Sequence, residues 1–208
     1  MRSSSERARG FTLIEVLVYS SVLAFLLGGL YLLVVAGSKH FQKGRAYQTA
    51  QQEALKGMTA LSRELKNAKA NSVLHTPLPT PNILFLSPEE PAPASAGSRE
   101  YDSAGQLLWK KWACFYRDTA ESTLVRREES ITPVALSVSD LPHLPPGDVL
   151  YFQTLAGVQS RVVARQIVNL SFADEAGGSI LVQLSASEAV SSDASTTVNL
   201  RSLVRLMN

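Results

Sequence analysis

The chain has 208 residues, 45% of them hydrophobic, which is enough for one modest globular domain together with a membrane segment. Its net charge of +2 comes from residues 1–10, because without their three Arg and one Glu the basic residues fall from 20 to 17 and the acidic residues from 18 to 17. A remainder with no net charge is a poor electrostatic match for nucleic acid, and a single cysteine, Cys114, excludes an internal disulfide.

A long apolar run, within residues 11–37, follows this short basic leader. From Val16 to Gly37 it has 22 residues, which as a helix would span about 33 Å and cross a bilayer. A secretory signal peptide is the alternative, but its apolar core is usually about 7–15 residues long and ends at a small-residue cleavage site. This run is longer and continues into a polar helical pattern. The basic leader predicts that the N-terminus stays in the cytoplasm.

Glu15 is the one acidic or basic side chain within residues 11–37. A carboxylate inside a membrane-length apolar segment costs roughly 2.5–3.5 kcal/mol on insertion scales. We therefore expect Glu15 to have a partner. The alternative is that Glu15, which is one turn from the start of the helix, reaches the cytoplasmic headgroups.

Residues 10–15 read GFTLIE, and with the leader and the apolar run they resemble the class III signal of type IV pilins and type II secretion pseudopilins. In that family a membrane-embedded prepilin peptidase cuts after the glycine and methylates the new N-terminal residue. The resemblance implies a cut between Gly10 and Phe11 and N-methylation of Phe11. It also implies that the new α-amine pairs with Glu15 of a neighbouring subunit, which would fix the register of helices in a filament.

The helix is expected to continue far beyond the membrane segment. No proline precedes Pro77, so the sequence permits an unbroken helix from about Phe11 to Ala70. Residues 38–70 form an amphipathic continuation that lays one face on a globular domain of residues 71–208. Charged residues, Glu64 among them, are predicted to lie off this face. The predicted apolar face consists of Tyr47, Ala50, Ala54, Met58, Leu61, Leu65 and Ala68.

Small residues recur within the membrane half of the helix. Ser20, Ala24 and Gly28 are four residues apart, a spacing that lets helices approach closely in lipid. Gly28 and Gly29 also weaken the helix locally. The sequence leaves two interpretations open, which are close helix packing and local unwinding within a filament.

The globular part is predicted to consist mainly of strands. The three prolines within residues 71–81 end the helix, and residues 175–178 fit a hairpin turn. The fold class predicted is α+β, with the long N-terminal helix packed on an antiparallel sheet, which is also the pilin architecture that the resemblance implies. The predicted strands are residues 82–86, 107–117, 123–129, 149–154, 160–164, 167–173, 179–186 and 197–206.

Three features favour a minor subunit within this resemblance. Residues 58–68 (MTALSRELKNA) resemble the helix end of J-type pseudopilins and W-type minor pilins, which have about this length. The strand pair around residues 115–118 and 124–127 is similar to the same group. The chain also lacks the helix-interior proline and the C-terminal disulfide that many major pilins have.

No constellation of catalytic or metal-binding residues is found in the sequence. The three histidines, His40, His75 and His143, have no second ligand at metal-binding spacing, and no EF-hand loop is present. Zinc-protease, thiol-redox, serine-hydrolase and phosphate-loop motifs are absent. Cys114 is interpreted as a small buried hydrophobic residue. The sequence therefore predicts no enzyme, no catalytic residue, no cofactor and no metal site.

These features together predict a minor pilin or pseudopilin that prepilin peptidase processes and that assembles with other pilins or pseudopilins into a type IV pilus or a type II secretion pseudopilus, near its tip. We expect a single-pass protein of the inner membrane, with its globular domain on the periplasmic side and no nucleic acid partner. Two alternatives are a binding protein displayed on a pilus, such as an adhesin or DNA-uptake factor, and a membrane-anchored hydrolase, for which the sequence offers no nucleophile and base.

Overall fold

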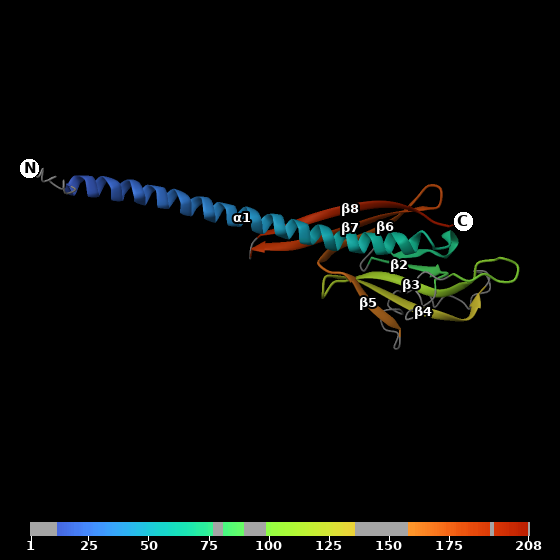
Figure 1. Cartoon of the computed structure of the whole chain (residues 1–208). Coiled ribbons are helices and arrows are strands. Elements are labelled where there is room, and N and C mark those ends of the chain that lie inside the picture. Colours follow the sequence, from blue (N-terminus) through green and yellow to red (C-terminus); the bar gives the residue numbers. More distant parts are fainter. Residues whose placement is uncertain (1–11, 77–80, 90–98, 136–157, 192–193, 208) are drawn as a thin grey trace, which may run out of the picture. The chain divides into compact units, whose positions relative to one another are not determined.

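The computed structural model describes residues 12–76, 81–89, 99–135, 158–191 and 194–207 (Figure 1). The chain divides into two compact units, Met1–Arg45 and Ala46–Asn208, which are described separately. One helix, α1 (Leu13–Leu65), has 53 residues and contributes to both units.

The described residues of the first unit form the N-terminal part of α1. Its apolar side chains are exposed, as in a helix that faces lipid. By length and composition, α1 is the one helix in the described part of the chain that can cross a membrane. This agrees with the apolar segment predicted from the sequence.

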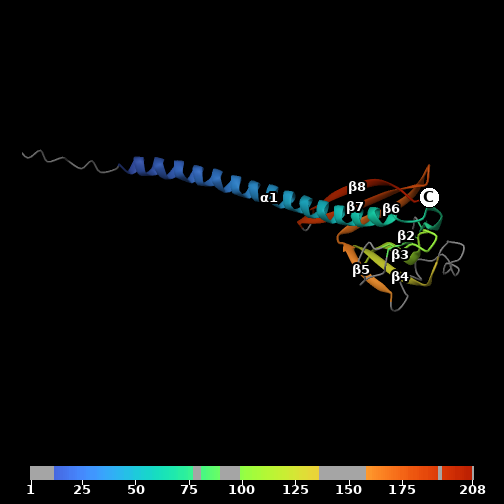
Figure 2. The same cartoon turned by 45° about the vertical axis from the view of Figure 1, so that its right-hand side comes forward.

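The second unit places two antiparallel sheets on the C-terminal part of α1. One sheet has the strand order β1-β2-β3-β4-β5 and the other the order β6-β7-β8. Figures 1 and 2 show the two sheets along different sides of this part of the helix. The strands are β1 (Leu74–Thr76), β2 (Asn82–Ser87), β3 (Trp109–Asp118), β4 (Thr123–Ala135), β5 (Gln159–Ala164), β6 (Ile167–Glu175), β7 (Ser179–Ser191) and β8 (Ala194–Arg205).

The predicted α+β layout is therefore confirmed, although the strands form two sheets where the sequence predicts one. The predicted hairpin turn joins β6 to β7, and Gly177 and Gly178 both have positive φ there, a conformation that glycine adopts without steric cost. The predicted strand at residues 149–154 lies outside the described residues.

The main core lies where α1 meets both sheets. It joins buried residues of the helix, such as Leu61 and Leu65, to Phe85 and Phe115 of the first sheet and to residues of the second sheet such as Leu184. The stacked rings of Phe85 and Phe115 have centroids 6.1 Å apart. Six of the seven residues in the predicted helix face are buried here.

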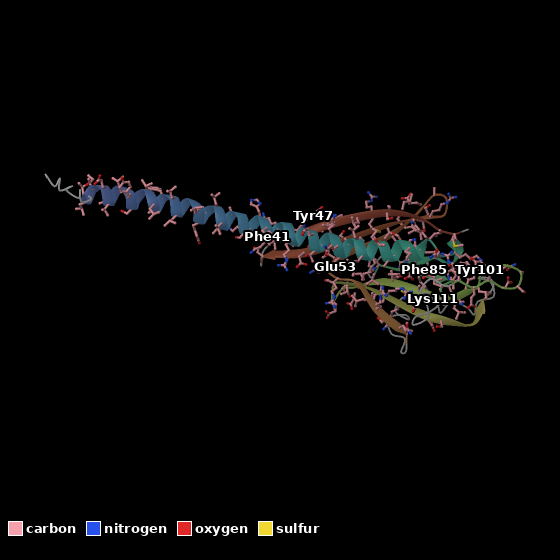
Figure 3. All side chains as sticks on the ribbon, viewed as in Figure 1. Phe41, Tyr47, Glu53, Phe85, Tyr101 and Lys111 are labelled. Atoms are coloured by element: carbon pink, nitrogen blue, oxygen red, sulfur yellow. The ribbon has the colours of Figure 1, made fainter. Side chains whose placement is uncertain are left out.

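Tyr47 is the exception in that face. Its side chain is 48% exposed, whereas Ala46 is buried (Figure 3). The buried positions run through Ala46, Ala50 and Ala54, so the helix meets the sheets on the side of its small residues. A small side chain there allows the strands to approach the helix backbone closely.

The other face of the five-stranded sheet carries a second buried cluster. It includes Trp112, Cys114 and Tyr116, which alternate with the core-facing residues along β3. Burial raises the pKa of the Cys114 thiol to about 12, so it stays protonated at neutral pH. This confirms that Cys114 is a small buried hydrophobic residue.

The helix ends earlier than the sequence predicts, at Leu65 rather than about Ala70. The turn that follows has i→i−3 hydrogen bonds, from Asn67 N–H to the Glu64 carbonyl and from Ala68 N–H to the Leu65 carbonyl, both 3.0 Å. The backbone of Ala68 and Ala70 then pairs with Met207 near the C-terminus, at 3.0 and 2.9 Å. Hydrogen bonds to a distant segment therefore replace the last turn of the predicted helix. A short 3₁₀ helix, η1 (Ala70–Ser72), follows. Strand β1 comes next, and the sequence analysis did not predict it.

Candidate functional site

The predicted processing and assembly residues lie at the start of α1. Gly10 and Phe11, the predicted cleavage site, lie outside the described residues. Glu15 is described, and it lies in the first turn of the helix. The cleavage, methylation and salt-bridge roles of these three residues therefore stay predictions.

Glu15 and Thr12 form a reciprocal cap on the N-terminus of α1. Glu15 N–H donates to the Thr12 hydroxyl oxygen at 3.3 Å. In return, both the backbone N–H and the hydroxyl of Thr12 donate to Glu15 Oε2 at 2.9 Å. Thr12 is thus the residue before the first helical residue, and Glu15 occupies the third helical position, as in a capping box.

This cap provides hydrogen-bond partners for backbone groups at a helix start that lies within or beside a membrane. The first backbone N–H groups of a helix have no partner inside the helix, and lipid offers none. The cap supplies an acceptor to the N–H groups of Thr12 and Glu15. A carboxylate at this end is also favoured by the helix dipole. Glu15 therefore has a role inside its own subunit.

The cap uses one oxygen of the carboxylate. Both hydrogen bonds to the Glu15 side chain end on Oε2, and within the described residues no hydrogen bond or ion pair to Oε1 is found. A carboxylate accepts at both oxygens. Glu15 can therefore hold the helix start with Oε2 and offer Oε1 to a cation from outside the chain.

Serine hydroxyls within the apolar segment are bonded to the helix itself. Ser20 donates to the Val16 carbonyl at 2.7 Å, and Ser21 donates to the Val18 carbonyl at 2.8 Å. These bonds remove the cost of placing a free hydroxyl among apolar groups. Both serines therefore act as small residues that leave room on the helix surface.

An open depression of about 750 Å³ lies on this segment. Ala24 and Gly28 of the predicted packing set line it, whereas the third member, Ser20, does not. A Cβ added at Gly28 or Gly29 would meet nothing within 4 Å, so both glycines leave open space. The depression is lined by Ser21, Ala24, Phe25, Gly28, Gly29, Tyr31 and Leu32. Its walls are suited to receive an apolar side chain of another helix.

A chain of buried charges lies in the second unit, between α1 and the five-stranded sheet. Arg126 Nε donates to Glu64 Oε1 at 2.6 Å, and Arg126 Nη2 lies 2.6 Å from Glu128 Oε2. Lys111 Nζ lies 2.9 Å from the same Glu128 oxygen. The exposed fractions of the four side chains lie between 2% and 13%. The sequence analysis placed Glu64 off the buried face, and this placement is wrong.

The charges of this network balance, because two carboxylates face two cations. Burial lowers the pKa of Arg126, but the hydrogen bonds and charges of Glu64 and Glu128 outweigh it and hold this pKa above its usual value. Arg126 therefore stays charged throughout the physiological range. Its groups are partners of one another, which suits a structural link between helix and sheet rather than a reaction centre.

Groups of three or more His, Cys, Asp or Glu that suit a metal ion are absent from the residues that the structure describes. His75 pairs with Asp174 across the two sheets, with 3.1 Å between Nε2 and Oδ1, and His40 belongs to the first unit. His143 lies outside the described residues.

Thr12 and the four residues of the buried charge network escaped the sequence analysis. Thr12 was recoverable, because Thr12 followed by Glu15 is the S/T-x-x-E pattern of a capping box. Glu64 had a weaker signal. Glu64 lies three residues after Leu61 and next to Leu65, so the sequence spacing already places it within the buried stripe. Its partner, Arg126, could not be predicted because it lies on a strand 62 residues away in the sequence.

Comparison with known proteins finds a similarity at the start of the chain. Residues 6–31 match the family described as the prokaryotic N-terminal methylation motif. No curated protein and no solved structure shows significant similarity to the chain. The matched residues include the end of the basic N-terminal segment, the capped helix start and the first part of the apolar segment.

The motif and the geometry agree on one kind of protein. The motif indicates processing by prepilin peptidase and assembly with other pilins. The exposed apolar helix, which begins within the matched residues, fits a membrane anchor. The chain thus carries a prepilin-type N-terminal methylation motif on a membrane-length helix, and this combination supports a type IV pilin-like protein.

Proposed function

We propose that the chain is a minor pilin or pseudopilin of the J or W type, a structural subunit of a type IV pilus or type II secretion pseudopilus. One observation carries this proposal. The methylation motif at residues 6–31 runs into a membrane-length helix whose first turn holds a carboxylate, Glu15, with one oxygen unused in the described part of the chain. Such a helix start is equipped to accept the α-amine of a neighbouring subunit.

The proposed organisation follows the same residues. Residues 1–10 are a leader that prepilin peptidase removes, residues 11–37 anchor the subunit in the inner membrane and pack in the filament, and residues 38–70 lead into the globular domain of residues 71–208. The basic leader stays in the cytoplasm, which places the globular domain on the periplasmic side.

A position near the tip suits the size of the globular part. Its two sheets and their connections make up most of the chain. A large domain crowds its neighbours in a helical stack but is accommodated at the end of one. The composition of the chain, with no net charge beyond the leader, favours a structural role over DNA uptake.

The first test is the intact mass and N-terminal sequence of the protein from membranes, with and without active prepilin peptidase. We expect a chain that begins at methylated Phe11 only when the peptidase is active. A Gly10→Ala variant should remain an uncleaved precursor. Ordinary maturation of this variant, or a wild-type chain that keeps residues 1–10 beside active peptidase, would overturn the proposal.

A further inference from the structure

A groove in the second unit lies between the solvent side of α1 and strand β5. It has a volume of about 570 Å³. Glu53, beside the groove, links the two elements, because its carboxylate accepts the backbone N–H of Arg165, just after β5, at 2.8 Å. The groove is lined by Gln52, Leu55, Lys56, Thr59, Ala60, Arg63, Arg161 and Val163.

The helix side of the groove is a second ordered stripe on α1. Its residues recur at steps of three and four from Gln52 to Arg63, as the buried stripe does, but they face solvent. Leu55 is 47% exposed, and the partly buried Val163 lies across from the helix. The fold does not need this stripe for its core, so an apolar floor remains open to a partner.

The described residues that line the groove carry charge of one sign. Lys56, Arg63 and Arg161 are among them, and none of the described lining residues is acidic. Lys56 already pairs with Glu53 at 2.5 Å. Within the described residues, neither Arg63 nor Arg161 makes an ion pair or a side-chain hydrogen bond. No described residue therefore occupies these two guanidinium groups, and guanidinium groups bind carboxylates in a bidentate geometry.

Strand β5 adds an open edge beside these groups. It pairs with β4 on one side, and no strand in the described part of the chain pairs with its other side. Most of its residues are exposed. An edge strand presents unpaired backbone N–H and C=O groups, which an extended segment of another chain can use.

We propose that this groove docks an extended, acidic segment of a neighbouring pilin-like subunit. Carboxylates of that segment pair with Arg63 and Arg161, and an apolar side chain between them lies on Leu55 and Val163. The inference rests on the proposed filament role and adds the chemistry of the partner to it.

Charge reversal tests the groove in full-length protein, in cells that assemble the filament. The variant Arg63→Glu/Arg161→Glu should be processed normally but should co-purify with other pilin-like subunits at least about tenfold less, because like charges across an interface are strongly unfavourable. The matched control is Arg201→Glu/Arg205→Glu, which makes the same change of charge on exposed positions of β8. Urea unfolding, followed by tryptophan fluorescence, verifies that both variants are folded.

The outcomes separate this inference from the proposed function. Normal processing with normal co-purification of the groove variant overturns the groove and leaves the filament role standing. A wild-type chain that is not processed overturns the filament role itself. Equal losses in the groove variant and in the β8 control show a general effect of charge and also overturn the groove.

A photocrosslinker identifies the occupant directly. We expect p-benzoylphenylalanine at position 59 to crosslink to a peptide of another subunit with a prepilin motif, and this peptide should contain more Asp and Glu than Lys and Arg. The same group at position 203 of β8 serves as control. A crosslink to lipid, to nucleic acid or to a basic segment, or none above the control, would contradict the proposal.

Discussion

Glu15 has two tasks at the residue scale, and they make different demands on its side chain. The cap needs a hydrogen-bond acceptor at the third helical position, which a glutamine also supplies. The proposed intersubunit pair needs a negative charge. Substitution can therefore separate the two tasks, since Glu15→Gln keeps the acceptor and removes the charge, while Glu15→Val removes both.

We expect both Glu15 variants to be cleaved by prepilin peptidase and both to incorporate poorly into filaments. Incorporation is measured as the fraction of mature chain that sediments with sheared filaments. If Glu15→Gln incorporates like the wild type while Glu15→Val does not, the carboxylate serves the cap alone. Normal incorporation of Glu15→Val would remove both roles from assembly.

Cys114 should be unreactive in the folded protein. With a pKa of about 12, its thiolate fraction at pH 8 is about 10⁻⁴, so alkylation should be about 10³-fold slower than for an exposed thiol, before shielding by the fold is counted. Mass spectrometry after iodoacetamide treatment measures this, with urea-unfolded protein as the control. Rapid labelling of the native chain would show that the cluster around Cys114 opens readily.

The same shift makes the stability of the fold depend on pH. The pKa of Cys114 is raised in the folded state from an ordinary value of 9.0. Its contribution is therefore fully present below about pH 9 and is lost as the pH rises toward about 12. The urea midpoint should fall over this range, and it should fall less in a Cys114→Ala variant. An identical decline in both proteins would assign the effect to other groups.

Removing one member of the buried charge network should destabilise the fold strongly. Glu64→Ala leaves Arg126 with one buried partner fewer, which costs about 3–5 kcal/mol in comparable cases. The double variant Glu64→Leu/Arg126→Met should lose less than Glu64→Ala, because it removes the pair together. Urea unfolding followed by the fluorescence of Trp109 and Trp112 reports on the second unit. A single-variant loss below about 1 kcal/mol would show that solvent reaches the network.

At the scale of elements, Gly57 fixes how closely α1 approaches the sheets. A Cβ there would lie 3.0 Å from Leu184 Cδ1, 3.1 Å from Leu124 Cδ2 and 3.3 Å from Ala164 Cβ. These neighbours come from both sheets and are themselves fully or almost fully buried, so they have little room to give way.

Gly57→Ala should therefore lower stability by about 1–2 kcal/mol, although alanine is the better helix former. Gly44→Ala is the matched control in the same helix, because a Cβ at Gly44 meets nothing within 4 Å. We expect that control to be neutral or to stabilise the helix by up to about 1 kcal/mol. Unfolding in urea compares the two, and equal midpoints for both variants would mean that the core around Gly57 adjusts.

The elements differ in how far the sequence predicts them. The apolar segment and the strands β6 to β8 follow hydrophobic patterns that local physics dictates, and the structure agrees. The end of α1 is different. No residue between Leu65 and Ala70 prevents a helix. The turn forms because the backbone of Ala68 and Ala70 hydrogen-bonds to Met207, and this distant partner cannot be predicted from the local sequence.

The whole molecule shows the same division. The sequence predicts a helix on antiparallel strands, but the separation into two sheets depends on which strands pair, and the main core is completed by residues of both. Likewise, Glu15 stands out in the sequence because it is the single charge in an apolar run. Glu64 does not stand out in the sequence, because charged residues are common in the polar half of the helix. Its buried role follows only from the position of Arg126 in the fold.

The reciprocal cap has a consequence for the timing of maturation. The described groups of the cap, namely the hydroxyl and amide of Thr12 and the carboxylate and amide of Glu15, lie on the C-terminal side of the predicted scissile bond. Removal of residues 1–10 therefore leaves the helix with the same first turn. Under the proposed function, cleavage replaces an arginine-containing extension with a single α-amine, and the first turn of α1 is formed before the cut. The time of cleavage, rather than a later rearrangement of α1, then determines when a subunit can assemble with its neighbours.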